Sequence, residues 1–292
     1  MSSSLDKVLP GSRADQDNSS EADGSDYPDG SPQTGGATAD DWVRIRFIKS
    51  TLILAIPVTL LSFLSGALWL AIHFSTPENF ERIHFWFYFF DVGREINVPT
   101  WFSAGLWILT GVVAGYIARK ASRFRKSWWL FASVCIFFSL DETLELHERL
   151  DLIGGRIAQL LPFEVGFTWI IPGIVIAAVL VLLLLRLVLS LPSAVRNGII
   201  GAGATFVSGA VVVETISGNW IQDNGMTWHF FAMVLVEETL EMAGVALCLA
   251  SLLHLLEYRR VGGGTAYRVA ERPPGRAGRQ RLARRDVGGS VV

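Results

Sequence analysis

The chain has only two cysteines in 292 residues, and this scarcity excludes a fold held together by a framework of disulfide bonds. Cys135 and Cys248 both lie inside long apolar runs, where a free cysteine behaves as a small apolar side chain. We therefore expect both to be buried thiols, and they indicate no redox compartment.

Charged residues are also scarce, at 18% of the chain, whereas 51% of the residues are hydrophobic and the mean hydropathy is +0.40. The apolar residues come in long runs and do not alternate with polar ones. A helix that crosses a hydrocarbon core of about 30 Å needs about 20 apolar residues, and several runs reach that length. The composition argues against a soluble protein and predicts an integral membrane protein.

Several motifs that would indicate a particular type of enzymatic reaction are absent from the sequence. Five histidines are too few for the histidine boxes of a membrane desaturase, and there is neither a phosphate-binding glycine loop nor a nucleophile elbow around any serine. The Glu-x-x-His pairs of ferritin-like di-iron proteins are absent, since the nearest pattern is Glu145-x-His147. No catalytic class follows from motifs, so function has to be inferred from where polar residues lie.

The two ends of the chain have opposite charge and little apolar content. Residues 1–41 are rich in Ser, Gly and Asp, which predicts a disordered acidic tail, and they lack the basic start and apolar core of a signal peptide. Residues 261–292 are rich in Arg and Gly, which predicts a disordered basic tail. We expect this basic tail to contact anionic lipid, the alternative being a solvated tail that helps to fix orientation.

The segment between the tails, residues 42–260, predicts an all-α bundle of six transmembrane helices. The expected spans are residues 51–74, 100–117, 128 into the 140s, 169–191, 198–216 and 228–256. Two outer connections, residues 75–98 and 148–165, predict helices at the membrane interface or ordinary connectors at the headgroup level. Aromatic residues near span ends are expected in the interfacial belts: Trp42, Trp101, Trp128, Trp169, Trp228 and Tyr258. Gly201, Gly203 and Gly209 predict close helix packing in the fifth span.

Basic residues predict the orientation of the bundle. They cluster before the first span, in alternate connections and after the sixth span, at Arg44, Arg46, Lys49, Arg119, Lys120, Arg123, Arg125, Lys126, Arg186, Arg196, Arg259 and Arg260. Because Lys and Arg are enriched in cytoplasmic loops, both termini are expected in the cytoplasm and the protein in the cell membrane.

Carboxylates interrupt two of the expected spans. The third span is apolar only from Trp128 to Leu140, which is too short to cross, so the acidic segment that follows must enter the membrane. The sixth span likewise contains Glu237, Glu238 and Glu241. Tracing the spans puts many acids and four of the five histidines in the outer half of the membrane: Glu95, Asp141, Glu142, Glu145, Glu214, Glu238, Glu241, His73, His84, His147 and His229.

A carboxylate at the centre of a membrane helix costs about 2.5–3.5 kcal/mol, so several of them need a cation, protons or basic partners. We predict a divalent-metal or proton site with Glu142, Glu145, Glu238 and Glu241 as primary groups. The supporting residues would be Asp141, His147, Glu214 and Glu95. Carboxylates with imidazole suit Mn, Fe or Zn, whereas carboxylates alone suit Ca or Mg. The alternative is that these acids form salt bridges and helix caps at the interface.

Helical spacing puts Asp141, Glu145 and Glu148 on one face of the third span, with His147 off that face unless the helix bends locally.

Three functions are compatible with a pocket lined by these carboxylates, and the sequence assigns no catalytic residue. One is a metal-dependent membrane enzyme acting on a lipid-like substrate. The second is a proton- or cation-coupled transporter, and the third is a non-catalytic scaffold or signalling subunit. The expected partner is the lipid bilayer, and no nucleic acid is expected.

Overall fold

The computed structural model describes residues 42–162, 164–261 and 264–270. Its α-helices are α1 Phe47–His73, α2 Pro77–Phe90, α3 Val98–Lys120, α4 Arg125–Leu144, α5 Asp151–Ala158, α6 Ile170–Ser190, α7 Ser193–Val207, α8 Glu214–Asn224 and α9 Trp228–His254. A 3-10 turn, η1 (Glu148–Leu150), precedes α5, and a π-helical segment, η2 (Ser208–Val213), joins α7 to α8. The predicted acidic tail lies outside the described residues, as do the predicted basic tail from residue 271 onward and its expected lipid contact.

Among the described residues, four helical stretches are long and apolar enough to cross a membrane: α1, α3, α6 and the continuous helix Ser193–Asn224. The structure is thus mostly helical, as predicted, with apolar helices typical of a membrane protein. The expected third and sixth spans correspond to α4 and α9, of 20 and 27 residues, and these two helices carry the acids. The count of six spans therefore stays a prediction.

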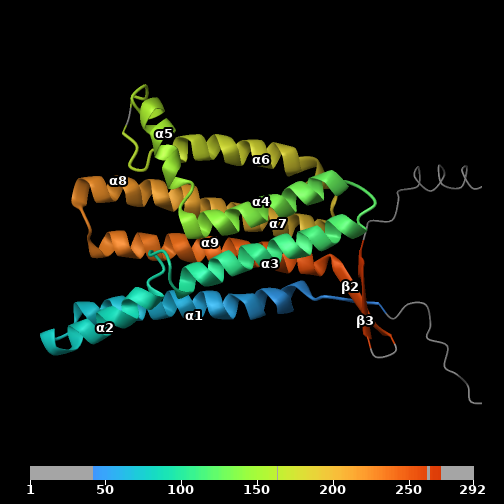
Figure 1. Cartoon of the computed structure of the whole chain (residues 1–292), viewed down its shortest axis with the longest axis horizontal. Helices are drawn as coiled ribbons and strands as arrows, with labels where there is room; N and C mark the ends of the chain where they lie inside the picture. Colours follow the sequence, from blue (N-terminus) through green and yellow to red (C-terminus); the bar gives the residue numbers. More distant parts are fainter. Residues whose placement is uncertain (1–41, 163, 262–263, 271–292) are drawn as a thin grey trace, which may run out of the picture. The chain divides into compact units, whose positions relative to one another are not determined.

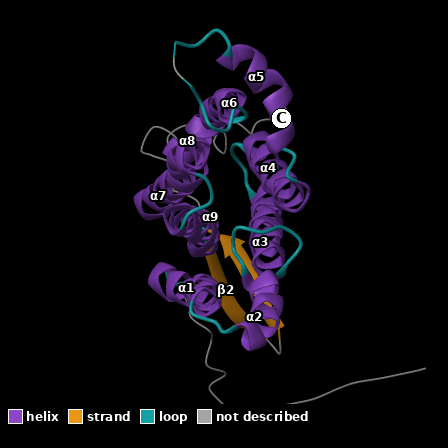
Figure 2. Ribbon diagram, turned by 90° about the vertical axis from the view of Figure 1, so that its left-hand side faces the viewer, coloured by secondary structure: helices purple, strands orange, loops and turns teal. Residues whose placement is uncertain are grey.

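Helix α9 is the central helix of the bundle. It contacts α1, α3, α7 and α8, and Figure 2 shows it between these neighbours. The long helices run side by side in Figure 1, with α5 at one end and the strands at the other. We call these the loop end and the sheet end. Buried apolar side chains such as Ile117, Leu187 and Leu252 fill the space between the helices at the sheet end.

Glycine lets α7 and η2 approach α9 closely, but only at some of the predicted positions. A Cβ atom on Gly209 would lie 2.7 Å from the backbone oxygen of Glu237, so close packing is confirmed there. On Gly201 and Gly203 a Cβ atom would meet nothing within 4 Å, so the prediction of close packing was wrong for these two. They lie on a side of α7 that is turned away from the neighbouring helices.

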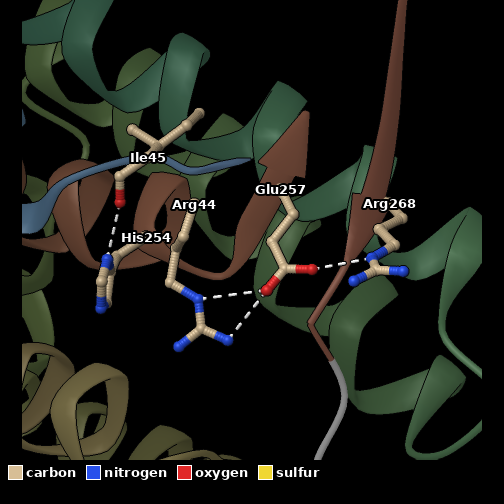
Figure 3. Close-up of polar contacts among 5 residues, drawn as sticks. All are labelled: Arg44, Ile45, His254, Glu257 and Arg268. Carbon is tan, nitrogen blue, oxygen red and sulfur yellow. Dashed lines mark hydrogen bonds and ion pairs between the residues drawn. The ribbon is translucent and has the colours of Figure 1, made fainter. Parts of the chain in front are cut away.

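A small antiparallel sheet in the order β1-β2-β3 joins the segment before α1 to the segments after α9. Strand β1 (Val43–Arg44) precedes α1, and strands β2 (Leu256–Val261) and β3 (Gly264–Val269) follow α9. The carboxylate of Glu257 accepts hydrogen bonds from Arg44 at 3.0 Å and from Arg268 at 2.7 Å (Figure 3). His254 Nδ1 also lies 2.7 Å from the backbone oxygen of Ile45.

The prediction of disorder from residue 261 onward was therefore wrong for residues 264–269. Strand β3 pairs along its whole length with β2, so the backbone groups on the side that faces β2 are hydrogen-bonded. Val269 also packs against the apolar cluster at the sheet end, which gives the strand a buried side chain. The backbone pairing with β2 and the burial of Val269 order this segment, although its polar composition predicts disorder.

Charge is distributed very unevenly between the two ends of the bundle. Thirteen of the seventeen described Lys and Arg residues lie at the sheet end: Arg44, Arg46, Lys49, Arg119, Lys120, Arg123, Arg125, Lys126, Arg186, Arg196, Arg259, Arg260 and Arg268. Of the sixteen described acids only Glu257 lies there, and the other fifteen lie between the middle of the helices and the loop end. The sheet end is strongly cationic and the opposite half is acidic.

Candidate metal site

Three carboxylates from two neighbouring helices converge between α8 and α9. Oxygen atoms of Glu214, Glu237 and Glu241 all lie within 4.8 Å of one another. Glu237 and Glu241 are one turn apart on the same face of α9, and Glu214 is the first residue of α8. Glu237 is buried and the other two are half-buried. We call this group the α8–α9 cluster.

The π-helical segment η2 ends directly before Glu214 and helps to place it. Such wider turns are rare and often occur at functional sites. Gly209 lies in this segment, and a Cβ atom there would also come within 3.0 Å of Glu241 Cγ. The backbone of η2 therefore lies directly against the part of α9 that carries Glu237 and Glu241.

Two side chains orient the carboxylates of the cluster by hydrogen bonds. The indole nitrogen of Trp169 donates to Glu214 Oε1 at 2.8 Å, and the hydroxyl of Ser217 lies 3.1 Å from Glu237 Oε2. Trp169 is only 8% exposed, so its ring is packed among its neighbours, and its expected level at the membrane interface stays a prediction. Trp128, at 3% exposed, is buried too. Groups that hydrogen-bond to metal ligands commonly fix the orientation of those ligands.

Trp169 is itself held in place by the connection between α4 and α6. Its backbone N–H donates to Asp151 Oδ1 at 2.6 Å, at the start of α5. The edge of its ring contacts the ring of His147, with the ring centroids 4.5 Å apart. His147 Nδ1 in turn lies 3.0 Å from Asp141 Oδ2. A continuous line of contacts thus runs from Asp141 through His147 and Trp169 to Glu214.

The end of α4 explains why His147 can reach Asp141. The helix ends at Leu144, and Glu145 adopts a left-handed conformation with φ of 48°. The predicted helical face of Asp141, Glu145 and Glu148 was therefore wrong, because the helix does not continue past Leu144. The local bend that His147 needed is present. Burial disfavours the charged imidazole, but the hydrogen bond and charge of Asp141 raise the pKa of His147 above its ordinary value.

A second group of carboxylates lies around the next residue of α9. Glu238 interacts electrostatically most strongly with Glu142 of α4, then with its neighbour Glu237 and with Glu95, which precedes α3. Glu142 makes a side-chain hydrogen bond with Ser103 of α3. Successive residues of a helix point about 100° apart, so Glu238 faces a different neighbour from Glu237. We call Glu95, Glu142 and Glu238 the α4–α9 group.

The structure brings together a different trio from the predicted primary set. Glu241, a predicted primary ligand, and Glu214, a predicted supporting residue, are both in the α8–α9 cluster, where Glu237 is the third member. Glu237 was recognised as an acid of the sixth span but not chosen as a ligand. Its spacing of four residues from Glu241 was the signal that could have found it. Trp169 and Ser217 carry no such signal in the sequence.

Stability should fall as the pH rises through the titration range of Glu95. Burial raises the pKa of Glu95 from its ordinary 4.5 to about 7, and the charges of Glu142 and Glu145 act in the same direction. An acid whose pKa is raised in the folded state destabilises the fold once it ionises. Its full contribution is present below the unfolded pKa of 4.5 and is lost as the pH rises through about 7.

We therefore expect Glu95→Gln to flatten the decline of the melting temperature in this pH window. The measurement is thermal unfolding in detergent across the window for the wild type and the variant. Glu78→Gln, a change at an exposed position of α2, serves as the control and should keep the wild-type slope. If the melting temperature of Glu95→Gln declines with pH as steeply as that of the wild type, the decline does not come from ionisation of Glu95.

The fold and the site together define a class of protein. It is a bundle of apolar helices, of membrane-like composition, with a candidate cation site formed by a carboxylate cluster. The chain belongs to a family described as a domain of unknown function (DUF8692), whose model matches residues 51–255. That range extends from the first turns of α1 to the end of α9 and includes both carboxylate groups. A comparison with curated proteins gave no match. A comparison with solved structures gave none either.

Proposed function

We propose that this protein is a multi-pass membrane protein that binds a divalent cation at the α8–α9 cluster. The six spans would be α1, α3, α4, α6, α7 with α8, and α9. Helix α4 has 20 residues, and at about 1.5 Å per residue it matches a hydrocarbon core of about 30 Å. The cationic sheet end supports an orientation with both termini in the cytoplasm of a cell-membrane protein, by the positive-inside rule.

The observation that carries the proposal is the convergence of Glu214, Glu237 and Glu241 on one point. Three carboxylates this close repel one another strongly in an apolar surrounding unless a cation or protons balance them. Two oxygens bound to one Ca²⁺ at about 2.3–2.6 Å lie at most about 5 Å apart, so a separation within 4.8 Å fits a shared ion. Oxygen ligands alone favour Mg²⁺, Ca²⁺ or Mn²⁺.

The proposed activity is that of a metal-dependent membrane enzyme acting on a lipid-like substrate. A divalent cation bound here would supply Lewis-acid activation of a water or of a substrate oxygen. Apolar side chains fill the sheet end, whereas Trp169 and His147 connect the cluster with the loop end. Access from one side suits catalysis on a molecule that enters from the outer leaflet better than passage through the bundle.

The test is elemental analysis of the detergent-purified protein, comparing the wild type with Glu237→Gln/Glu241→Gln. We expect about one divalent ion per chain in the wild type and almost none in the variant, because two of three ligands lose their charge. The matched control, Glu78→Gln/Glu81→Gln on the exposed surface of α2, should keep the ion. A folded Glu237→Gln/Glu241→Gln protein with unchanged stoichiometry would contradict the proposal.

A third variant, Glu142→Gln/Glu238→Gln, tests the ligands that the sequence suggested. Loss of the ion in this variant would extend the metal site to α4, with Glu145, Asp141, His147 and Glu95 as supporting groups. Retention would restrict the site to the α8–α9 cluster. Both outcomes are read from the same elemental analysis.

One observation favours a second candidate, a proton- or cation-coupled transporter. The carboxylates do not stop at the α8–α9 cluster, because Glu241 also interacts electrostatically with Glu238 and Glu142. A row of acids gives a cation more than one position within the bundle. Uptake of Mn²⁺ into sealed proteoliposomes that is lost in Glu142→Gln/Glu238→Gln would favour transport over catalysis.

A further inference from the structure

The sheet at the cationic end has one face turned to the bundle and one turned away from it. Side chains alternate between the faces of a strand, and residues paired across an antiparallel ladder share a face. Leu256 pairs with Val269, and both belong to the packing of the apolar cluster at the sheet end. The neighbouring pairs Arg44 with Glu257 and Glu257 with Arg268 therefore occupy the opposite face.

This opposite face combines guanidinium groups with an aromatic ring. It consists of Trp42, Arg44, Glu257, Arg259 and Arg268, and we call it the guanidinium face. The guanidinium carbons of Arg259 and Arg268 lie 5.2 and 4.5 Å from the ring centroid of Trp42. Such cation–π contacts hold Arg side chains at a surface without neutralising their charge.

The charges on the guanidinium face are not balanced. Glu257 is its one described carboxylate, and it already accepts hydrogen bonds from both Arg44 and Arg268 (Figure 3). Arg259 Nε is buried and has no hydrogen-bond partner among the described residues. Three guanidiniums against one carboxylate leave an excess of two positive charges, in a region where no other described acid lies.

The position of the face in the chain puts it at the level of lipid headgroups. Helices α1 and α9 have 27 residues each, about 40 Å, which covers the hydrocarbon core and part of both headgroup regions. Strand β2 begins two residues after the end of α9, and β1 ends three residues before the start of α1. Along the strands the arginines alternate with Val43 and Tyr267, which lie on the other face of the sheet and are about half exposed, at 51% and 49%. Apolar and aromatic groups interleaved with Arg are typical of a membrane interface.

We propose that the guanidinium face binds the phosphate group of anionic phospholipids in the adjoining leaflet. Arg forks bind phosphate oxygens by charge-assisted, often bidentate hydrogen bonds, and among the described residues the charge of Arg259 is not paired with a carboxylate. The attraction of each basic residue near an anionic membrane surface corresponds to about a five-fold gain in affinity. This site is separate from the α8–α9 cluster and does not depend on a cation being bound there.

The test is native mass spectrometry of the full chain in detergent, with phosphatidylglycerol or phosphatidylcholine added at equal concentration. The wild type should retain phosphatidylglycerol in preference to phosphatidylcholine. Arg259→Gln/Arg268→Gln should lower that preference by roughly five-fold for each guanidinium removed. Arg259→Lys/Arg268→Lys keeps the positive charge and should retain most of the preference for phosphatidylglycerol. The matched control, Arg82→Gln/Arg149→Gln at exposed positions of the loop end, should leave it unchanged.

Equal retention of both lipids by the wild type would overturn the proposal, as would an equal loss in the loop-end control. Displacement of phosphatidylglycerol by an equal concentration of inorganic phosphate would also overturn it, since the face would then bind a soluble anion. Arg259→Gln alone leaves the ion pair of Arg268 with Glu257 intact. This single variant keeps the test decisive if the double variant fails to fold.

Discussion

Replacing Gly209 with alanine is expected to lower the free energy of unfolding by about 1–3 kcal/mol, the usual cost of overpacking. The new Cβ atom would lie 2.7 Å from the backbone oxygen of Glu237 and 3.0 Å from Glu241 Cγ, so α9 must move away from η2. A metal site tolerates changes of only about 0.2 Å in its ligand distances. Divalent-cation affinity should therefore fall by at least about ten-fold, although all three carboxylates remain.

Gly203→Ala in α7 is the matched control. A Cβ atom there meets nothing within 4 Å, and alanine is favoured over glycine in a helix by up to about 1 kcal/mol. This variant should be as stable as the wild type or slightly more so, with unchanged cation affinity. Thermal unfolding and Mn²⁺ titration of both variants make the comparison. Equal stability and equal Mn²⁺ affinity of Gly209→Ala and Gly203→Ala would show that the close approach of η2 to α9 affects neither property.

Trp169→Ala is expected to destabilise the protein by about 3–5 kcal/mol, because it removes a large side chain that is 8% exposed. Trp169→Phe separates packing from hydrogen bonding. It keeps most of the ring but removes the N–H group that donates to Glu214 Oε1. Loss of a partner that orients a metal ligand typically lowers metal affinity by about 10–100-fold. We expect the phenylalanine variant to fold and to bind the cation correspondingly more weakly.

The control for Trp169→Phe is Trp101→Phe, at a position of α3 that is 77% exposed. The two changes remove the same atoms, so any difference between them reports the hydrogen bond and burial of Trp169. The measurements are the melting temperature and the affinity for Mn²⁺. Wild-type affinity in a folded Trp169→Phe protein would contradict an orienting role of the indole.

The helices of the first and fourth spans could be predicted from the sequence because each is a long apolar run without acidic residues. The expected first span, residues 51–74, overlaps almost all of α1, and the expected fourth span matches α6 within one residue at each end. The helix in residues 75–98 was also expected and corresponds to α2. The hairpin of β2 and β3 was missed, although alternating residues around three successive glycines are a recognisable hairpin signal.

The site was predicted only in part, for reasons that concern local geometry. The sequence indicated that acids of the third, fifth and sixth spans lie at a similar depth, but not which of them face each other. The π-helical turn before Glu214 and the early end of α4 at Leu144 both change the direction of the following side chains. Neither feature has a reliable signature in a single sequence, so the sequence could not show that α4 ends before Glu145 or that Glu237 lies beside Glu214 and Glu241.

The pairing of β1 with β2 also sets an order of events during synthesis. Arg44 and its partner Glu257 are 213 residues apart, so β1 leaves the ribosome long before the strand that it pairs with. A chain grows from its N-terminus, and β1 can pair with β2 only after α9 has been made. The completed sheet therefore forms only in chains that already contain every helix from α1 to α9.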